Sequence, residues 1–291
     1  MTIALASIGL APMERKLICY QSPFGHVAMQ PLYKPDNTTA AYQLNWSVAL
    51  FGTDEFPPAA KWLSELKAAA ESDSVRILEH HLAAANVIQF LVRSKPHIAP
   101  SQIVRSLKGR WQYLIRDTNP KAFRRNYSIG SIGEANSDVL ARYVARQPQN
   151  HPMAHSRVQE RIGALQYHDS GLDFGSERFS THGRFVHNLH VVLENEGGWH
   201  ETRADVLIRS RQMIIDSAKK HSWGLARIGL VTNHVHILLS TNVTESPESV
   251  ALCLMNNLAY VQQMEPVLRF SYYVGTFGEY DRAAIRKNLR S

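Results

Sequence analysis

The chain contains little cysteine and no apolar run of membrane-spanning length. Its two cysteines, Cys19 and Cys253, lie far apart and form no Cys-x-x-Cys pair. A disulfide framework or a structural zinc site is therefore not expected, and the composition fits a reducing compartment. The first eleven residues are apolar, but the basic segment that begins a signal peptide does not precede them. We expect a cytoplasmic protein without membrane contact.

Acidic residues are also in deficit. The 25 Asp and Glu are outnumbered by 32 Lys and Arg, which gives a formal net charge of +7. An excess of this sign favours a polyanionic partner. Nucleic acid is preferred over an anionic membrane because no basic amphipathic helix stands out in the sequence.

What the sequence does contain is an internal repeat. Residues 127–134, Tyr-Ser-Ile-Gly-Ser-Ile-Gly-Glu, recur with conservative changes at 272–279, Tyr-Tyr-Val-Gly-Thr-Phe-Gly-Glu. Eight consecutive matches at one offset indicate two related halves. We predict an α+β fold in which each half forms an antiparallel sheet with helices packed on it. The predicted boundaries are an N-terminal extension at 1–37, a first repeat at 38–147, a linker at 148–182 and a second repeat at 183–291.

Each half is predicted to run strand, helix, strand, strand, helix, strand, helix. In the first half the strands fall at 42–51, 75–78, 86–93 and 127–132, and the helices at 57–72, 102–116 and 137–147. In the second half the strands fall at 185–194, 226–229, 232–240 and 272–277, and the helices at 203–221, 247–263 and the C-terminus. The predicted linker is rich in Pro, His, Ser and Gly.

The strand at 232–240 carries two histidines, His234 and His236. Side chains alternate along a strand, so both imidazoles point to one face while Val235 and Ile237 point to the other. Two imidazoles on one strand face form half of a divalent-metal site. Alone, a His-x-His pair is weak evidence, because a solvated pair on a strand is more common.

The order of features in each half resembles a known family. A strand with His-hydrophobe-His, a basic helix, an aromatic strand ending in Gly-x-x-Gly and a helix bearing Tyr are similar to the single-tyrosine HUH transposases. The segments Ser106–Arg110 and Arg142–Gln147 match patterns of the bacterial REP-associated tyrosine transposases. The resemblance covers about 40–147 and 184–291. It implies tandem HUH domains of ferredoxin-like fold in a bacterial, nucleoid-associated protein.

The resemblance also implies a chemistry. In the family, two histidines and a Gln one turn after the Tyr hold a divalent metal, Mg²⁺ or Mn²⁺. The Tyr attacks a DNA phosphate and becomes linked to the 5′ end. The family acts as a homodimer, and the Tyr helix of one subunit can complete the histidine site of the other.

The two halves depart from this pattern in complementary ways. The first half keeps Tyr143 and Gln147 but has Asn86-Val87-Ile88 where the histidine strand is expected. The second half keeps the histidines but has Asn288 at the position matching Tyr143. Sites built within each half would both be incomplete, whereas a site shared between halves is complete. We therefore predict a monomeric, fused pseudo-dimer with one composite site, Tyr143, Gln147, His234 and His236, and one degenerate site, Asn86, Ile88 and Asn288.

Basic residues are concentrated in the first half. The segment 101–125 has one acidic residue, Asp117, whereas the matching segment of the second half has a single basic residue, Arg269. This asymmetry favours a DNA-binding track in which Trp111, Tyr113 or Phe123 could stack on bases. The predicted DNA-binding residues are Arg105, Lys108, Arg110, Arg116, Lys121, Arg124 and Arg125.

Two functions remain open at this stage. One is a metal-dependent single-stranded DNA endonuclease and strand transferase that recognises DNA hairpins and forms a 5′-phosphotyrosine intermediate. The alternative is a domesticated, catalytically silent hairpin-binding protein. A small-molecule metallohydrolase is disfavoured because no further His or Asp ligand set has a suitable spacing. His187 and His190 are interpreted as structural, and the pairs His80-His81 and His151/His155 as surface residues.

Overall fold

The computed structural model describes residues 30–279. Of these, residues 32–279 belong to one compact unit. The predicted C-terminal helix and Asn288 lie outside the described residues. Among residues 30–279, no helix is long and apolar enough to cross a membrane.

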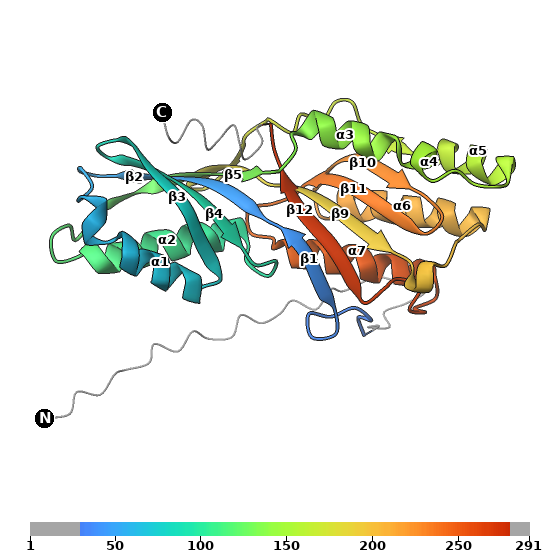
Figure 1. Cartoon of the computed structure of the whole chain (residues 1–291), viewed down its shortest axis with the longest axis horizontal. Coiled ribbons are helices and arrows are strands. Elements are labelled where there is room, and N and C mark those ends of the chain that lie inside the picture. Colours follow the sequence, from blue (N-terminus) through green and yellow to red (C-terminus); the bar gives the residue numbers. More distant parts are fainter. Residues whose placement is uncertain (1–29, 280–291) are drawn as a thin grey trace, which may run out of the picture. The chain divides into compact units, whose positions relative to one another are not determined.

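The mixed α+β class predicted from the sequence is confirmed, with two sheets that each carry a pair of helices (Figure 1). The first part contains β1 (Thr39–Gln43), β2 (Asn45–Gly52), α1 (Leu63–Ser72), β3 (Val75–Ala84), β4 (Val87–Ser94), α2 (Pro100–Ile115), β5 (Phe123–Ile132), α3 (Ser137–Ala145) and α4 (Gln147–Asn150). The second contains β8 (Gly183–Val186), β9 (Asn188–Glu194), α6 (Ala204–Lys220), β10 (Gly224–Leu230), β11 (His234–Ser240), α7 (Pro247–Val261) and β12 (Ser271–Phe277). Between them lie α5 (Ser156–Ala164), β6 (Tyr167–His168) and β7 (Arg178–Ser180).

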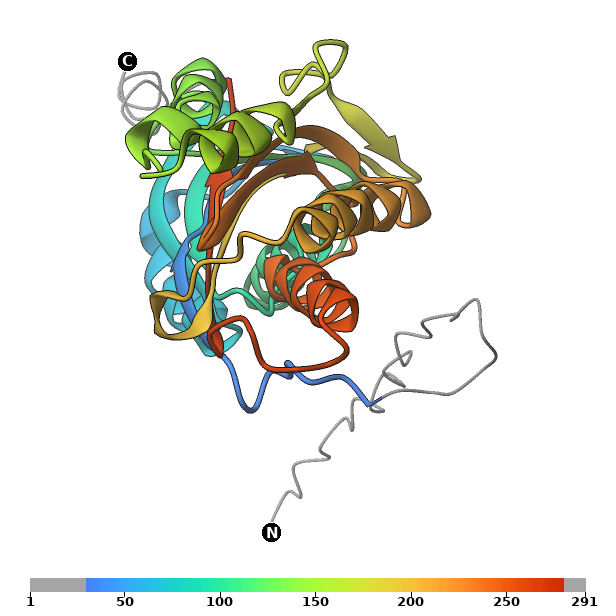
Figure 2. The same cartoon turned by 90° about the vertical axis from the view of Figure 1, so that its right-hand side faces the viewer.

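The two sheets share one arrangement of strands. The first sheet has the order β3-β4-β2-β5-β8-β7, and the second has the order β1-β12-β9-β11-β10-β6. In each, four neighbouring strands are antiparallel and follow the same relative order, β3-β4-β2-β5 and β10-β11-β9-β12. One face of each sheet is covered by its helix pair, α1 with α2 or α6 with α7, and the other is called the outer face below (Figure 2).

Each half contributes one strand to the other half's sheet. The strand β1 pairs in parallel with β12, and β8 pairs in parallel with β5. The continuous strands predicted at 42–51 and 185–194 are therefore wrong at Leu44 and His187, which are fully buried where the chain passes between sheets. The sequence did not reveal either break because no Gly or Pro interrupts it near Leu44 or His187.

Two hydroxyl groups join the sheets through reciprocal hydrogen bonds. Ser131 Oγ accepts from the backbone N–H of Asn188 at 3.0 Å and donates to the carbonyl of Phe277 at 2.7 Å. Thr276 Oγ1 accepts from the N–H of Asn45 at 2.8 Å and donates to the carbonyl of Ile132 at 2.7 Å. Each half thus offers one hydroxyl that bonds to the backbone of the other half. This reciprocity is the pattern of an isologous interface, in which the same contacts are made by both partners.

Substituting Thr276 by Val should destabilise the fold by roughly 2–4 kcal/mol, because it leaves the buried N–H of Asn45 and carbonyl of Ile132 without this partner. Urea unfolding followed by circular dichroism measures the change. The matched control is Thr39→Val on the exposed β1, which should change stability by less than about 0.5 kcal/mol. Equal effects of the two substitutions would contradict a junction role for the Thr276 hydroxyl.

The segment 148–182, predicted as a linker, is part of the folded unit. It contains α5, whose Ile162 is buried, and two short strands. The strand β6 pairs with β10 of the second sheet, and β7 pairs with β8 at the edge of the first. The high Pro, Ser and Gly content marks the turns of this segment rather than an unstructured connection.

Candidate active site

The helices α3 and α4 come from the first half but lie on the outer face of the second sheet, opposite α6 and α7 (Figure 2). Asn136 begins α3 by accepting a hydrogen bond from the backbone N–H of Val139. The helix predicted at 137–147 is interrupted at Arg146 because Pro148 has no N–H to continue the hydrogen-bond ladder. The short helix α4 then turns Gln147 inward, where it is 1% exposed.

Gly229 of β10 allows α3 to approach the sheet closely. A Cβ atom at this position would lie 2.7 Å from a methyl carbon of Val144 and 3.0 Å from its carbonyl oxygen. Val144 is fully buried against Leu238 and Phe277 of the second half. Gly229 is also the direct strand partner of His236, so this close contact sets how near the helix lies to the histidines.

The structure brings the four residues of the predicted composite site together. The rings of Tyr143 and His236 are 5.5 Å apart and nearly perpendicular, at 85°. Gln147 Oε1 lies 3.4 Å from Nε2 of His234. Two of these side chains come from the first half and two from the second. The Tyr143 side chain is 48% exposed and so can be reached from solvent.

Hydrogen bonds on one side of each imidazole orient the other side toward the site. Nδ1 of His234 bonds to the side-chain oxygen of Asn233 at 2.8 Å, which requires its proton on Nδ1. Nδ1 of His236 bonds to Nε2 of His190 at 2.9 Å. Burial lowers the pKa of His234 to about 4 and of His236 to about 2, with neighbouring histidines adding to both effects. Both rings are therefore neutral at neutral pH.

Sequence reasoning missed two histidines beside this pair. His190, interpreted as structural, hydrogen-bonds His236, and its ring stacks on that of His236 at 5.2 Å. Burial lowers the pKa of His190 to about 4. His151, interpreted as a surface residue, lies with its ring 4.7 Å from that of His234. The pairing register of β9 with β11 could have placed His190 there, but no local signal could have placed His151.

These residues suit a divalent metal. Neutral imidazoles and amide oxygens are metal ligands, and a hydrogen bond on the far nitrogen of each ring is the usual way in which proteins orient such ligands. Within residues 30–279 no group of three or more His, Cys, Asp and Glu side chains is arranged to hold a metal ion. The donors that could hold a metal here are those of the predicted set, two imidazoles, His234 and His236, and the amide oxygen of Gln147.

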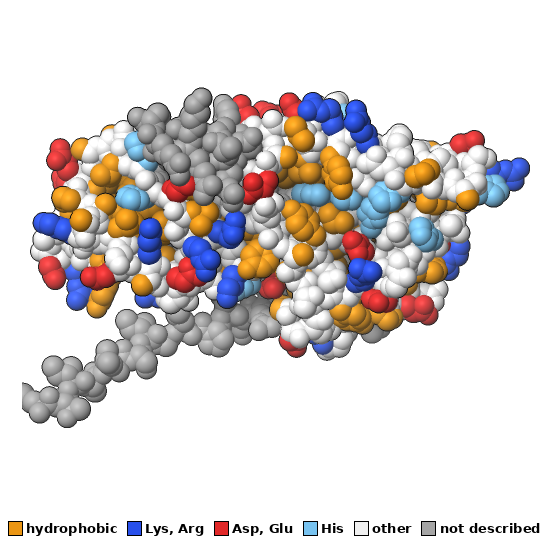
Figure 3. Space-filling view, viewed as in Figure 1, with side chains coloured by type: hydrophobic (Ala, Val, Ile, Leu, Met, Phe, Trp, Pro, Cys, Tyr) orange, Lys and Arg blue, Asp and Glu red, His pale blue; other side chains and the backbone are white. Residues whose placement is uncertain are grey.

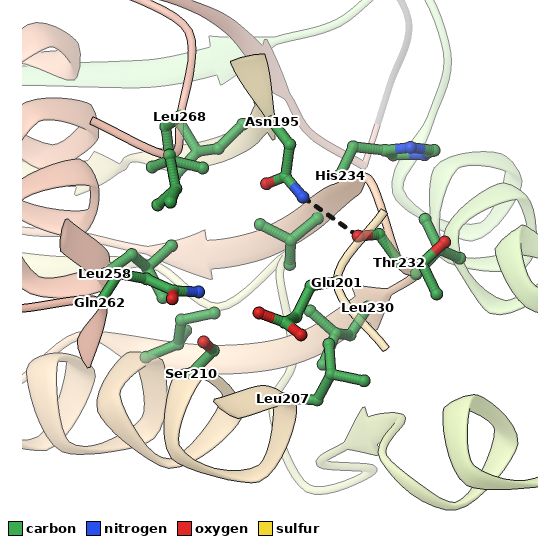
Figure 4. A pocket seen from close by; sticks show the side chains of 15 residues that line it. Asn195, Glu201, Leu207, Ser210, Leu230, Thr232, His234, Leu258, Gln262 and Leu268 are labelled. Atoms are coloured by element: carbon green, nitrogen blue, oxygen red, sulfur yellow. Dashed lines mark hydrogen bonds between the residues drawn. The ribbon is translucent and has the colours of Figure 1, made fainter. Parts of the chain in front are cut away.

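A small cavity lies behind the turn that leads into the histidine strand (Figure 4). It has a volume of about 40 Å³, room for a water molecule but not for a substrate. Asn195 crosses it to donate to the carbonyl of Thr232 at 3.0 Å. The buried carboxylate of Glu201, which lines the cavity, is paired with Arg203 at 2.7 Å. These bonds fix the turn that holds Asn233 against His234.

The strand register corrects the assignment of the degenerate site. The partner of His234 on β9 is Glu194 and that of His236 is Val192. On β2, the corresponding positions pair with Val87 and Gln89. Asn86 instead lies in the turn before β4, and Ile88 is fully buried in the core on the helix side. The sequence match was one residue out of register. The hairpin β3–β4 and the hairpin β10–β11 differ in the length of their turns and in the positions of their β-bulges.

The predicted DNA-binding residues fall into two groups. The ammonium group of Lys108 donates to three backbone carbonyls, at 2.6, 3.1 and 3.2 Å, and all its donors are used within the protein. Arg110 is paired with Asp73 at 2.7 Å. Trp111 is fully buried, so it cannot stack on bases. The other predicted residues are exposed, and Arg116 lies 3.7 Å from Asp117: Arg105, Arg116, Lys121, Arg124 and Arg125.

Replacing Gly229 with Ala should loosen α3 and α4 from the second sheet, since the new methyl group overlaps Val144. Hydrogen–deuterium exchange of residues 137–150 should accelerate by about tenfold or more, while the strands stay protected. The matched control is Gly130→Ala in β5, where an added Cβ meets no atom within 4 Å. Unchanged exchange in α3 would show that Gly229 does not set this contact.

One segment of the chain matches a known protein family. Residues 59–147 match the family model described as "Transposase IS200 like", a range that includes Tyr143 and Gln147 but neither histidine of the site. No curated protein matches the chain. The family match supports a transposase-like function.

Two solved structures are similar to parts of the chain. One is a REP-associated tyrosine transposase bound to a REP hairpin, with 7% sequence identity and a TM-score of 0.29 over 35% of this chain and 62% of that one. The other is described as a candidate transposase from Deinococcus radiodurans R1, with 16% identity and a TM-score of 0.30 over 42% of this chain and 95% of that one. The resemblance seen in the sequence is thus confirmed over residues 59–147, which are similar to the IS200-like transposases.

Proposed function

We propose that the chain is a single-stranded DNA endonuclease and strand transferase with one composite tyrosine site. The observation that carries the proposal is the meeting of Tyr143 and Gln147 from the first half with His234 and His236 from the second. A tyrosine half exposed beside two neutral, buried imidazoles has the parts of a nucleophile and a metal-binding pair.

In the proposed reaction, the phenol oxygen of Tyr143 attacks a DNA phosphorus atom. The phenol loses its proton as its oxygen bonds to the phosphorus, which keeps its bond to the 5′ oxygen. The bond from phosphorus to the 3′ oxygen breaks, and that oxygen takes up a proton to leave as a 3′-hydroxyl. A divalent metal, Mg²⁺ or Mn²⁺, would supply Lewis-acid polarisation of the phosphate when bound by His234, His236 and Gln147. His190 and Asn233 hold the two imidazoles in orientation. The phosphotyrosine conserves the bond energy, so a second 3′-hydroxyl can reverse the reaction and join strands.

We further propose that the chain is a fused pseudo-dimer of two HUH-like repeats, at 38–147 and 183–291, that works as a monomer. The exchanged strands β1 and β8 and the reciprocal bonds of Ser131 and Thr276 support this proposal, since each feature occurs twice with the halves interchanged. The second copy of the site, at Val87 and Gln89, has no histidine. One functional site thus remains per chain.

The partner proposed for this site is single-stranded DNA next to a hairpin, in the bacterial cytoplasm. The family resemblance supports a hairpin as part of the DNA that the chain recognises. Exposed arginines on both sides of Tyr143, Arg142 and Arg146, add positive charge where the scissile phosphate would lie. The alternative, a silent hairpin-binding protein, is favoured by one observation, namely that an entire second site has been lost.

One assay separates the two functions. The full chain is incubated with hairpin-containing single-stranded DNA and Mn²⁺ or Mg²⁺, and products are separated on a denaturing gel. The proposed enzyme gives a covalent protein–DNA band, which does not form when EDTA is present from the start of the incubation. Hairpin binding without any covalent band, over a panel of tailed hairpins, would favour the silent binder.

A further inference from the structure

A pocket in the first half gathers three cations that sequence analysis did not assign to DNA binding. It has a volume of about 320 Å³ and lies where β3 begins and β4 ends, beside β1. Figure 3 shows Lys and Arg side chains gathered over this part of the first sheet, on the face that also displays the histidines. The lining residues are Tyr42, Glu71, Ser74, Arg76, Arg93, Ser94 and Lys95.

The charges of this pocket are not balanced within the protein. Arg76 and Arg93 are direct partners on antiparallel strands, an arrangement of like charges that destabilises a sheet. Lys95 adds a third cation two residues further on. The one acid that lines the pocket, Glu71, forms a bidentate ion pair with Arg76 at 2.8 and 2.9 Å. The hydrogen bonds from Arg76, with the charge of Lys95, lower the pKa of Glu71.

The corresponding place in the second half is built differently. The positions matching Arg76 and Arg93 are Gly224 and Ser240, which pair directly on β10 and β11. There Arg178 of β7 donates to the carbonyl of Thr241 at 3.1 Å and to the side chain of Asn242 at 2.9 Å. The second half thus has one arginine, which is hydrogen-bonded within the protein. The pocket of the first half has three cations: Arg76 is paired with Glu71, Arg93 makes a long hydrogen bond of 3.4 Å to Asn45 Oδ1, and Lys95 is the third.

We infer that this pocket binds the phosphate backbone of single-stranded DNA that leads to the composite site. Arg93 and Lys95 would contact phosphates, since Arg76 is engaged with Glu71. Tyr42, which is 42% exposed at the rim, would stack on a base. This inference rests on the proposed function for its ligand, but it concerns binding alone.

The test uses the full chain with fluorescein-labelled DNA hairpins, with and without a single-stranded tail of about ten nucleotides. Binding is followed by fluorescence anisotropy over a range of KCl concentrations. Arg93→Gln combined with Lys95→Gln should weaken binding of the tailed hairpins about tenfold near 0.1 M salt. It should also lower the slope of log affinity against log salt by about 1.4, and leave the untailed hairpin unaffected. Tyr42→Ala should weaken tailed binding about fivefold without changing that slope.

The matched control removes two charges from the helix layer of the second half, by Arg209→Gln combined with Lys219→Gln in α6. An equal loss of affinity in this control would contradict DNA binding by the pocket. Equal losses on tailed and untailed hairpins would contradict it too. So would unchanged tailed binding in an Arg93→Gln, Lys95→Gln protein that melts at the wild-type temperature. The chain could bind the tail through the pocket and yet form no covalent adduct. That result would support DNA binding by the pocket and contradict the proposed nuclease function.

Discussion

Replacement of Tyr143 with Phe is expected to abolish covalent attachment of DNA, with a rate loss on the order of a thousandfold or more. The change removes only the hydroxyl oxygen that would form the bond to phosphorus. The phenyl ring can keep its perpendicular contact with His236, and the buried Val144 and Gln147 that seat the helix are untouched. Single-turnover incubation with labelled tailed hairpin, quenched in denaturant, measures the loss.

Two controls make this result specific. Tyr113→Phe changes a more exposed tyrosine of α2, on the first half, and should leave adduct formation intact. Anisotropy with the same DNA should show that Tyr143→Phe binds as the wild type does. A covalent band that persists in Tyr143→Phe would mean that another residue is the nucleophile and that the composite site is wrongly assigned.

The sequence was most informative where a pattern is local. The alternation along 232–240 placed His234 and His236 on the face opposite Val235 and Ile237, and the structure has this arrangement. The repeat at 127–134 and 272–279 marked the two strands, β5 and β12, that meet at the junction. Periodicity works in these segments because each strand buries one face against its own helices.

The sequence was least informative where the answer depends on pairing between distant segments. Nothing local shows that β1 and β8 change sheets, since no Gly or Pro interrupts the sequence around Leu44 or His187. The histidine match fell at Asn86 and Ile88 rather than Val87 and Gln89, because bulges in β3 shift the register. Lys108 looked like a phosphate contact, but its carbonyl partners come from the start of β5, 16 to 18 residues later.

The second large effect concerns the histidine side of the site. His236→Ala should abolish the adduct and also weaken Mn²⁺ binding, measured by calorimetry in the absence of DNA. Removing one of three donors from a site with two imidazoles leaves too few ligands for tight binding, so we expect at least about a tenfold weaker affinity. The control is His187→Gln: His187 is buried against Trp46 and bonded to Thr241, so this change should leave Mn²⁺ affinity unaltered.

Mixing the two inactive variants then tests whether the site is built within one chain. Tyr143→Phe chains retain both histidines, and His236→Ala chains retain the tyrosine. If chains exchanged α3, as separate subunits can, the mixture would regain adduct on the His236→Ala chain. In this structure the start of α3 is fixed to its own chain, because the N–H of Ser137 bonds to the carbonyl of Gly278 at 2.9 Å and Asn136 forms a bridge with Gly278.

We therefore expect the mixture to form no more adduct than the two variants do separately, even after prolonged incubation at high protein concentration. Giving the two chains different lengths lets a denaturing gel show which of them carries DNA. Adduct on the His236→Ala chain would show that tyrosine helices pass between molecules, and the working unit would then be a pair of chains. Its absence, together with full activity of the unmixed wild type at low concentration, would locate both halves of the site in a single polypeptide. That outcome would also explain the one-sided loss: a tyrosine and a histidine pair that always meet within one chain need to be kept only once.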